Sequence, residues 1–272
     1  MLPYIAVPEL TMISADAFGR GWPAQSIGIQ PFGAIVLLAV GVGVALTLRQ
    51  GVRRDCSRAA LVAFIYYVVI GGFLFGHLLE LLLYAPEVVA NRPSALFDIA
   101  QGQSSLGGFV GATLGAVAFR LVQRTPVLPL IEIVASSFPA AWVIGRIACA
   151  VAHDHPGLRS DQWFAVAYPA GGRLDLGLLE AAAVLPLALA MLLLRRERRP
   201  EGFFVGTMCL FYAPLRFGLD FLRASDVLQA DRRYFGATPA QWGMVGLFGI
   251  GMYFSAWARI ERGGKARGNA PA

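Results

Sequence analysis

Charged residues are scarce in this chain of 272 residues, at 15% of the total, whereas hydrophobic residues make up 57%. A soluble domain carries about 25% charged and about 45–50% apolar residues. The shortage of charge argues against an ordinary soluble protein, and the mean hydropathy of +0.60 favours an integral membrane protein. The sequence also lacks a Pro/Ser-rich linker, a low-complexity tract and an internal repeat. We therefore expect one multi-span membrane domain over residues 1–272.

Cysteine is also scarce, and the three cysteines, Cys56, Cys149 and Cys209, form no Cys-x-x-Cys pair. Their wide spacing indicates no disulfide framework. The first thirty residues lack a basic start before an apolar core, and they lack an obvious cleavage site, so they are not typical of a signal peptide. We expect residues 1–30 to form an arm on the outer surface.

Apolar blocks long enough to cross a bilayer recur along the chain, since a transmembrane helix needs about 20 such residues. They predict an all-α fold with seven transmembrane helices, separated by short polar loops. The predicted spans are residues 31–48, 59–83, 105–122, 127–151, 176–194, 203–222 and 240–258.

Arginine-rich loops indicate the orientation, because short positively charged loops stay in the cytoplasm. The segments RQGVRRDCSR, RRERRPEG and RIERGGKARG follow the first, fifth and seventh predicted spans, and FRLVQRTP follows the third. All four lie on one side if the N-terminus is outside. We therefore expect an outer N-terminus and a basic cytoplasmic tail over residues 259–272. The net charge of +6 favours contact with anionic headgroups of the lipid bilayer, and not with a nucleic acid.

Ionisable residues inside the predicted spans are candidates for function, because a charge within a bilayer is costly unless it is paired or faces water. Arg216, Asp220 and Arg223 are spaced to stack on one face of a helix. The others are His77, Glu80, Glu132, Arg146 and Glu180. Most lie toward the outer ends of their spans, which predicts a net positive pocket suited to a phosphate. The alternative is that long side chains simply extend to the headgroups.

The third predicted span opens with GQSSLGGFVGATLGA, in which Gly107, Gly111 and Gly115 are four residues apart. Small residues at this spacing let two helices approach closely, and we expect this packing role for Gly111 and Gly115. At the outer end, Ser104 and its neighbours could instead line a ligand site with backbone N–H groups.

The stretch GRIACAVAHDHPG, residues 145–157, gathers an arginine, a cysteine and two of the three histidines, and three interpretations are open. His153, His155 and Cys149 could bind a metal, because Cys149 and His153 are one helical turn apart, although no His-Glu-x-x-His motif accompanies them. The histidines could be ordinary residues at a membrane surface. Arg146 and the loop after it could form the floor of a phosphate-handling site.

This stretch resembles the signature of the prolipoprotein diacylglyceryl transferase family, approximately G-R-x-G-N-F-x-N-x-E-x-x-G. Gly145, Arg146 and Gly157 stand at matching positions, and Asp154 stands at the acidic one. The resemblance extends over nearly the whole chain. It continues in SIGIQPFGAIVLL, HLLELLLYAPE, GQSSLGGFVGA, DLGLLEA, RRPEGFFVGTMCLFYAPLRFGLDFLR and TPAQW, which include Glu180, Asp220 and Gln241.

The resemblance implies a transferase of the bacterial cytoplasmic (inner) membrane. It would move a diacylglyceryl group from phosphatidylglycerol to the lipobox cysteine of a prolipoprotein and release glycerol-1-phosphate, without a metal or a redox cofactor. Arg146 and Arg223 would hold the leaving phosphate as its charge develops, supported by Arg216 and Asp220. The other residues expected at the substrate site are His77, Ser104, Gly157, Glu180 and Gln241.

The chain departs from the family pattern at three positions: Phe32 replaces a tyrosine, Leu106 replaces the loop histidine, and Cys149 replaces an asparagine. These losses permit an alternative, an inactive member that only binds lipid or precursor. A further alternative is a metal-dependent membrane hydrolase built on the His-Asp-His loop.

If the reaction needs a base, His153 is the preferred imidazole, ahead of His77 and His155. It follows Arg146 by seven residues, which is two helical turns if the helix persists, so that both would face one cavity. Asp154 would orient His153 or line the same pocket.

Overall fold

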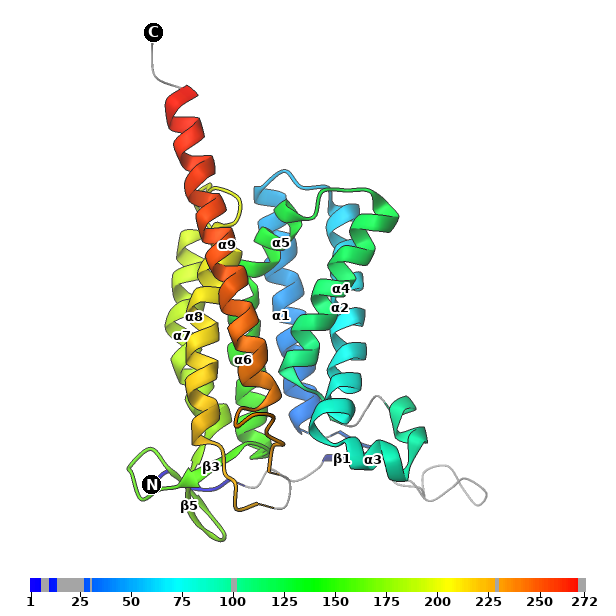
Figure 1. Ribbon diagram of the computed structural model, residues 1–272, viewed down its shortest axis with the longest axis vertical. Helices are drawn as coiled ribbons and strands as arrows, with labels where there is room; N and C mark the ends of the chain where they lie inside the picture. The colour runs from blue at the N-terminus through cyan, green and yellow to red at the C-terminus, as the bar shows by residue number, and fades with distance from the viewer. Residues whose placement is uncertain (6–9, 14–26, 30, 99–101, 228–229, 269–272) are drawn as a thin grey trace.

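The computed structural model describes residues 1–5, 10–13, 27–29, 31–98, 102–227 and 230–268, and most of the expected outer arm lies outside them. The described chain is mostly helical, and its long helices run side by side along one axis (Figure 1). They are α1 (Pro31–Arg53), α2 (Arg58–Leu79), α4 (Ser105–Gln123), α6 (Phe138–Ala152), α7 (Leu176–Leu194), α8 (Phe203–Leu219) and α9 (Pro239–Gly268). The shorter α5 (Leu128–Ala135) precedes α6. Short helical segments are η2 (Glu80–Tyr84), α3 (Pro86–Asn91), η3 (Pro93–Phe97) and η4 (Asp220–Leu222).

Five helical segments are long and apolar enough to cross a membrane, and the bent pair of α5 and α6 makes a sixth if it is counted as one span. The seventh predicted span falls in α9, which is 30 residues long. This helix is not among the segments that are both long enough and apolar enough to cross a membrane. The seventh span and the orientation therefore stay predictions.

The fourth predicted span is broken into two helices that differ in direction by 49°. The hydroxyls of Ser136 and Ser137 turn back to donate to the carbonyl oxygen of Ile133, at 2.7 and 3.3 Å. Pro139, in the first turn of α6, has no N–H to continue the hydrogen-bond ladder. The prediction of one continuous helix over 127–151 was therefore wrong at this point.

Small sheets modify the predicted all-α fold. Between α6 and α7, the strands β3 (Pro156–Arg159), β4 (Val166–Tyr168) and β5 (Gly171–Asp175) form an antiparallel sheet in the order β3-β5-β4. Two further strands, β1 (Leu10–Ile13) and β2 (Ile27–Ile29), pair with each other. Strands of three to five residues carry too little periodic signal to be recognised among polar and glycine residues.

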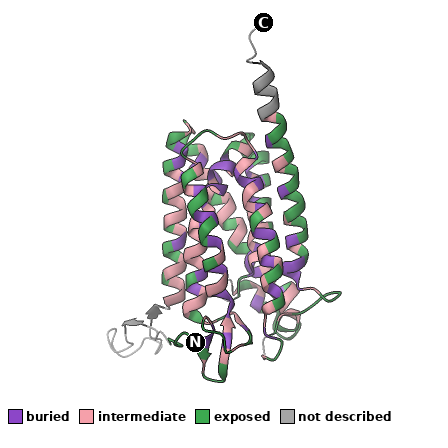
Figure 2. Cartoon of the chain, turned by 90° about the vertical axis from the view of Figure 1, so that its left-hand side faces the viewer, coloured by how far each residue is buried: buried purple, intermediate pink, exposed green. Residues whose placement is uncertain are grey.

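The two ends of the bundle are different in character. The end that carries β3, β4 and β5, here called the sheet end, also holds residues 1–5, where the backbone of Leu2 pairs with β4. The opposite end, here called the tail end, holds the loops 54–57 and 195–202 and the last turns of α9 (Figure 1). Buried residues follow the inner sides of the helices between the two ends (Figure 2).

The contact between α2 and α4 depends on glycine. A Cβ on Gly111 would overlap the carbonyl oxygen of Gly71, and one on Gly115 would overlap the carbonyl oxygen of Tyr67. The packing role predicted for Gly111 and Gly115 is confirmed, because the two backbones approach too closely for any side chain between them.

Candidate functional site

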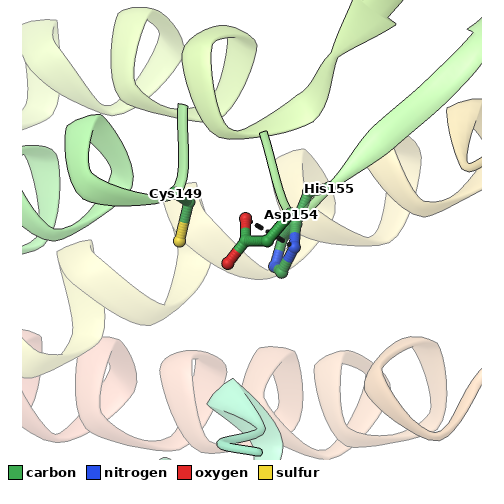
Figure 3. Close-up of side chains that lie close together, drawn as sticks. All are labelled: Cys149, Asp154 and His155. Atoms are coloured by element: carbon green, nitrogen blue, oxygen red, sulfur yellow. Dashed lines mark ion pairs between the residues drawn. The ribbon is translucent and has the colours of Figure 1, made fainter. Parts of the chain in front are cut away.

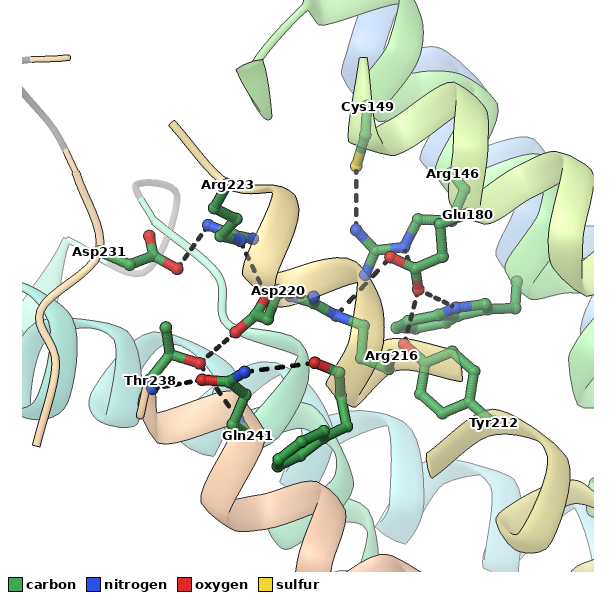
Figure 4. A network of polar contacts seen from close by, with 12 residues as sticks. Arg146, Cys149, Glu180, Tyr212, Arg216, Asp220, Arg223, Asp231, Thr238 and Gln241 are labelled. Carbon is green, nitrogen blue, oxygen red and sulfur yellow. Dashed lines mark hydrogen bonds and ion pairs between the residues drawn. The ribbon is translucent and has the colours of Figure 1, made fainter. Parts of the chain in front are cut away.

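A buried polar network at the sheet end begins with an ion pair between α6 and α7 (Figure 4). Nε of Arg146 lies 3.1 Å from Oε1 of Glu180, and less than a tenth of either side chain is exposed. The indole N–H of Trp142 and the hydroxyl of Tyr212 also donate to Glu180, at 3.0 and 2.6 Å. The guanidinium of Arg146 lies 4.5 Å from the centre of the Trp142 ring, within reach of a cation–π interaction. Three side chains, those of Arg146, Trp142 and Tyr212, therefore hold this carboxylate in place.

The network continues at the end of α8. Arg216 forms an ion pair with Asp220, and its Nε lies 3.7 Å from Oε2 of Glu180. Nε of Arg223 lies 3.0 Å from the same Asp220 carboxylate, and its NH1 lies 2.5 Å from Asp231. The fully buried Asp220 thus joins two arginines, and Arg216 joins two carboxylates.

Arg216, Asp220 and Arg223 meet as predicted, but they do not share one helix face. The α-helix ends at Leu219, Asp220 begins the 3₁₀ segment η4, and Arg223 has extended backbone with ψ of 139°. The chain leaves the helix here because Arg223 pairs with Gly157 in an isolated antiparallel bridge. Sequence spacing alone does not reveal this tertiary contact.

Gly157 contributes its backbone and not a ligand-binding side chain. A Cβ at this position would lie 2.9 Å from the carbonyl oxygens of both Leu174 and Leu222. Only glycine therefore lets β3 approach the segment that carries Arg223 this closely.

Gln241 lies next to the network, where it begins α9. The backbone N–H of Thr238 donates to Oε1 of Gln241 at 3.0 Å, and the N–H of Gln241 donates to the Thr238 hydroxyl at 3.1 Å, which is a capping box. The Thr238 hydroxyl also donates to Asp220. The amide of Gln241 donates to the carbonyl oxygen of Phe217 at 3.3 Å. Gln241 thus ties α9 to the end of α8.

The charges of the network balance, contrary to the predicted net positive pocket. Three guanidinium groups face three carboxylates: Arg146, Arg216 and Arg223 against Glu180, Asp220 and Asp231. Asp231 lies outside the predicted spans and was not recognised as a candidate from the sequence. Buried cations need such partners, because an unpaired charge in a low-dielectric interior is strongly unfavourable.

His77 and Ser104 lie at the α2–α4 contact and make structural interactions there. The ring nitrogens of His77 lie 3.3 and 3.1 Å from the carbonyl oxygens of Gly102 and Ala95. Ser104 caps α4 by accepting from the N–H of Gly107 at 3.1 Å, and it donates to the carbonyl oxygen of Gly76 at 3.2 Å.

His153 does not continue the helix of Arg146. The helix α6 ends at Ala152, and His153 takes a left-handed conformation with φ of 51°. Its Nδ1 lies 2.9 Å from Asp175, and its ring stacks on Tyr4 at 4.2 Å between centroids. The expectation of a helix persisting through His153 was wrong, because helix termination here is set by these tertiary contacts.

Asp175, and not Asp154, orients His153. Asp175 also accepts from the hydroxyl of Tyr168 at 2.9 Å and caps α7 through the N–H of Leu178 at 3.0 Å. Burial and the Asp175 carboxylate raise the pKa of Tyr168. Asp154 instead lies 3.0 Å from Nδ1 of His155. Among the described residues, the potential metal ligands that lie together are Cys149, Asp154 and His155, so the predicted set that included His153 is not assembled.

Trp142 and Tyr212 belong to the network but were not recognised from the sequence. Each lies four residues before an arginine of the network, Arg146 or Arg216, and so one helical turn away on the same face. An aromatic residue four positions before an arginine inside an apolar helix is the sequence pattern that could have identified both.

Comparison with known proteins points to a single family. Residues 22–257 match the family described as prolipoprotein diacylglyceryl transferase. The chain is 28% identical over 219 residues to the phosphatidylglycerol–prolipoprotein diacylglyceryl transferase of Chromohalobacter salexigens, covering 78% of this chain and 80% of the relative. The protein of the same name from Rhizobium leguminosarum bv. trifolii is 32% identical over 188 residues, covering 66% of this chain and 67% of the relative. That from Pseudomonas putida is 26% identical over 275 residues, covering 96% and 97%. The chain belongs to the prolipoprotein diacylglyceryl transferase family.

Proposed function

We propose that this chain transfers a diacylglyceryl group from phosphatidylglycerol to the lipobox cysteine of prolipoproteins in the bacterial cytoplasmic (inner) membrane. Its relatives carry this activity in their names. The observation that supports it here is the buried arginine network at the sheet end. In the reaction, the cysteine sulfur forms a bond to the carbon of the diacylglyceryl unit that carries the phosphate. The bond between this carbon and the phosphate oxygen breaks, and glycerol-1-phosphate leaves. The proton of the thiol passes to a base.

The leaving phosphate gains charge as the C–O bond breaks, and fixed guanidinium groups would stabilise that charge. Arg146 and Arg223 are proposed for this role. Arg146 is held in place by Glu180 and Trp142, so that it loses little freedom when it binds. The Arg223 side chain is 17% exposed and is the more accessible of the two. Phosphate would compete with the carboxylate of Asp231 for Arg223.

The sheet end is proposed to face the outer leaflet, with the arginine-rich loops of the tail end in the cytoplasm. This orientation places the network where a secreted precursor and the headgroup of an outer-leaflet lipid can meet. A reporter enzyme fused to the C-terminus should report cytoplasm. A periplasmic signal would contradict the proposed orientation.

His153 is proposed to assist deprotonation of the lipobox cysteine. Asp175 holds one ring nitrogen, and the other, Nε2, is buried without a hydrogen-bond partner among the described residues. A free cysteine has a pKa of about 8.5, so that little thiolate is present at pH 7. His153→Ala should therefore lose most activity at pH 7 and recover part of it as the pH rises. Unchanged rates between pH 6.5 and 7 would exclude this role.

The experiment that tests the function is turnover in phosphatidylglycerol-containing vesicles. The purified full-length chain is mixed with lipid labelled in its acyl chains and with a synthetic lipobox peptide. A peptide with Ser in place of Cys is the control. Transfer of label to the Cys peptide alone is the expected result. Binding of lipid and peptide without transfer would instead identify an inactive family member.

A further inference from the structure

Three potential metal ligands meet where α6 gives way to the turn before β3 (Figure 3). The sulfur of Cys149, a carboxylate oxygen of Asp154 and a ring nitrogen of His155 all lie within 4.8 Å of one another. Cys149 is in the last turn of α6, and the other two follow the left-handed residue that ends it. The change of direction at this residue brings ligand atoms from the helix and from the turn together.

In the described part of the chain, the imidazole of His155 lacks a hydrogen bond that its burial calls for. Nδ1 of His155 is buried but has no hydrogen-bond partner among the described residues. An oxygen of Asp154 lies 3.0 Å away, yet outside hydrogen-bonding geometry. A buried polar atom left without a partner is unfavourable, because it has lost its hydrogen bonds to water. A cation between the imidazole and the carboxylate would satisfy both groups.

We propose that Cys149, Asp154 and His155 bind one zinc ion, with water as the fourth ligand. A thiolate, an imidazole and a carboxylate are the donors that zinc takes, and three protein ligands with one water is an established arrangement for it. The thiolate and the carboxylate together balance the charge of the ion. Coordination releases the thiol proton to solvent.

The distances require a small closure around the ion. At zinc–sulfur and zinc–nitrogen lengths of about 2.3 and 2.0 Å, tetrahedral ligand atoms lie roughly 3.5 Å apart. The Asp154 side chain is 37% exposed and that of His155 is 25% exposed, and both lie on a turn outside regular structure. Their rotation can close the remaining gap of about 1 Å without moving the helix that carries Cys149.

This set keeps Cys149 and His155 from the one considered from the sequence, but Asp154 takes the place of His153. The ring of His153 is held by Asp175 and Tyr4. Binding of the ion does not depend on the proposed transferase activity, and it can be measured whether or not the chain turns over.

The first test is cobalt binding to the purified, chelator-treated chain. Co²⁺ replaces zinc at such sites, and its bond to a thiolate gives a charge-transfer absorption band in the near ultraviolet. We expect one Co²⁺ per chain, a band that Cys149→Ser abolishes, and displacement of the ion by Zn²⁺. His155→Asn and Asp154→Asn should each weaken binding by roughly tenfold or more. Cys56→Ser and Cys209→Ser are matched controls and should keep the band.

The second test uses the unmutated chain, so that a folding defect cannot explain the result. Zn²⁺ should protect Cys149 from alkylation, read by peptide mass spectrometry, while Cys56 at the tail end is alkylated at an unchanged rate. Equal alkylation of Cys149 with and without Zn²⁺ would overturn the proposal. So would a cobalt band that persists in Cys149→Ser, or one lost in His153→Asn but kept in His155→Asn.

Discussion

The two ends of the bundle use the same residue types for different purposes. At the tail end, Arg198 pairs with Asp55 at 3.2 Å, and both side chains are at least 80% exposed. At the sheet end, Arg146 pairs with Glu180 at a similar distance, and both are almost completely buried. Arginines in polar loops indicate orientation, whereas arginines inside apolar helices must be given partners by the fold.

Buried carboxylates show the same division of roles. Glu132, near the tail end, accepts hydrogen bonds from the N–H groups of Phe204 and Val205 at 3.0 and 2.9 Å. It therefore caps the first turn of α8, where a negative charge is favourable. Glu180 instead neutralises guanidinium groups from two other helices. A carboxylate that satisfies a helix end is structural, while one that holds cations in place prepares a site for an anion.

The largest effect should come from removing the carboxylate at the centre of the network. Glu180→Gln keeps the size of the side chain but leaves Arg146 without its carboxylate partner. Breaking a buried pair in this way costs about 3–5 kcal/mol. Asp55→Asn at the tail end is the matched control and should cost about 0–1 kcal/mol, because exposed pairs contribute little. Thermal unfolding in detergent measures both. Equal shifts would contradict the distinction between the two ends.

A comparably large effect, on rate, is expected at Arg146. Arg146→Ala should lower kcat/KM for lipid transfer by about 10²–10³, the typical cost of one donor to a developing negative charge. Arg146→Lys should also be impaired, since an ammonium group cannot reproduce the planar fork of a guanidinium. Arg198→Lys at the tail end is the control and should keep full activity. Full activity in Arg146→Lys would show that Arg146 does not hold the phosphate.

The sequence predicted what depends on local composition. The apolar block at 176–194 coincides with α7, and the block at 105–122 ends within one residue of α4. It also identified Arg146, Glu180, Arg216, Asp220 and Arg223 as residues that meet, because charges inside apolar helices must find each other.

Features that depend on tertiary contacts were not predictable in the same way. The left-handed end of α6 at His153 is stabilised by Asp175 and Tyr4, residues distant in sequence. The carboxylate of Asp231 reaches Arg223 from a loop with no apolar pattern. Long-range partners of this kind leave no periodic signal along the chain, so the charge balance of the site could not be read from it.

A smaller effect is expected at Asp231, which lies at the more accessible edge of the network, than at the buried Glu180. Asp231→Asn removes the carboxylate with which phosphate would compete for Arg223, while Asp220 still holds that arginine. We expect KM for phosphatidylglycerol to fall roughly two- to fivefold, about 0.4–1 kcal/mol, the worth of a partly exposed pair. The value of kcat should change little, because only ground-state binding is altered. A rise in KM would show that Asp231 supports lipid binding and does not oppose it.

The smallest effect is expected at β5, where Arg173 joins the sheet to the segment after α8. Its guanidinium donates to both oxygens of Asp226, at 2.9 and 2.6 Å, and Arg159 donates to the same carboxylate at 3.3 Å. Hydrogen bonds from Arg173 lower the pKa of Asp226 below its ordinary value. The stabilisation is therefore complete above the unfolded pKa of about 3.9, and it is lost as the pH falls through the lower folded value.

The unmutated chain should consequently melt slightly above Asp226→Asn between pH 6 and 8, and this difference should shrink steadily below about pH 4. The effect stays small because Asp226 is 47% exposed, so that water screens the pair. Melting curves of both chains in detergent, recorded from pH 8 down to pH 3, measure the difference directly. Asp55→Asn, which removes an exposed pair at the tail end, should differ little from the unmutated chain throughout. A difference for Asp226→Asn that grew as the pH fell would show that the Arg173 contact does not hold the carboxylate ionised.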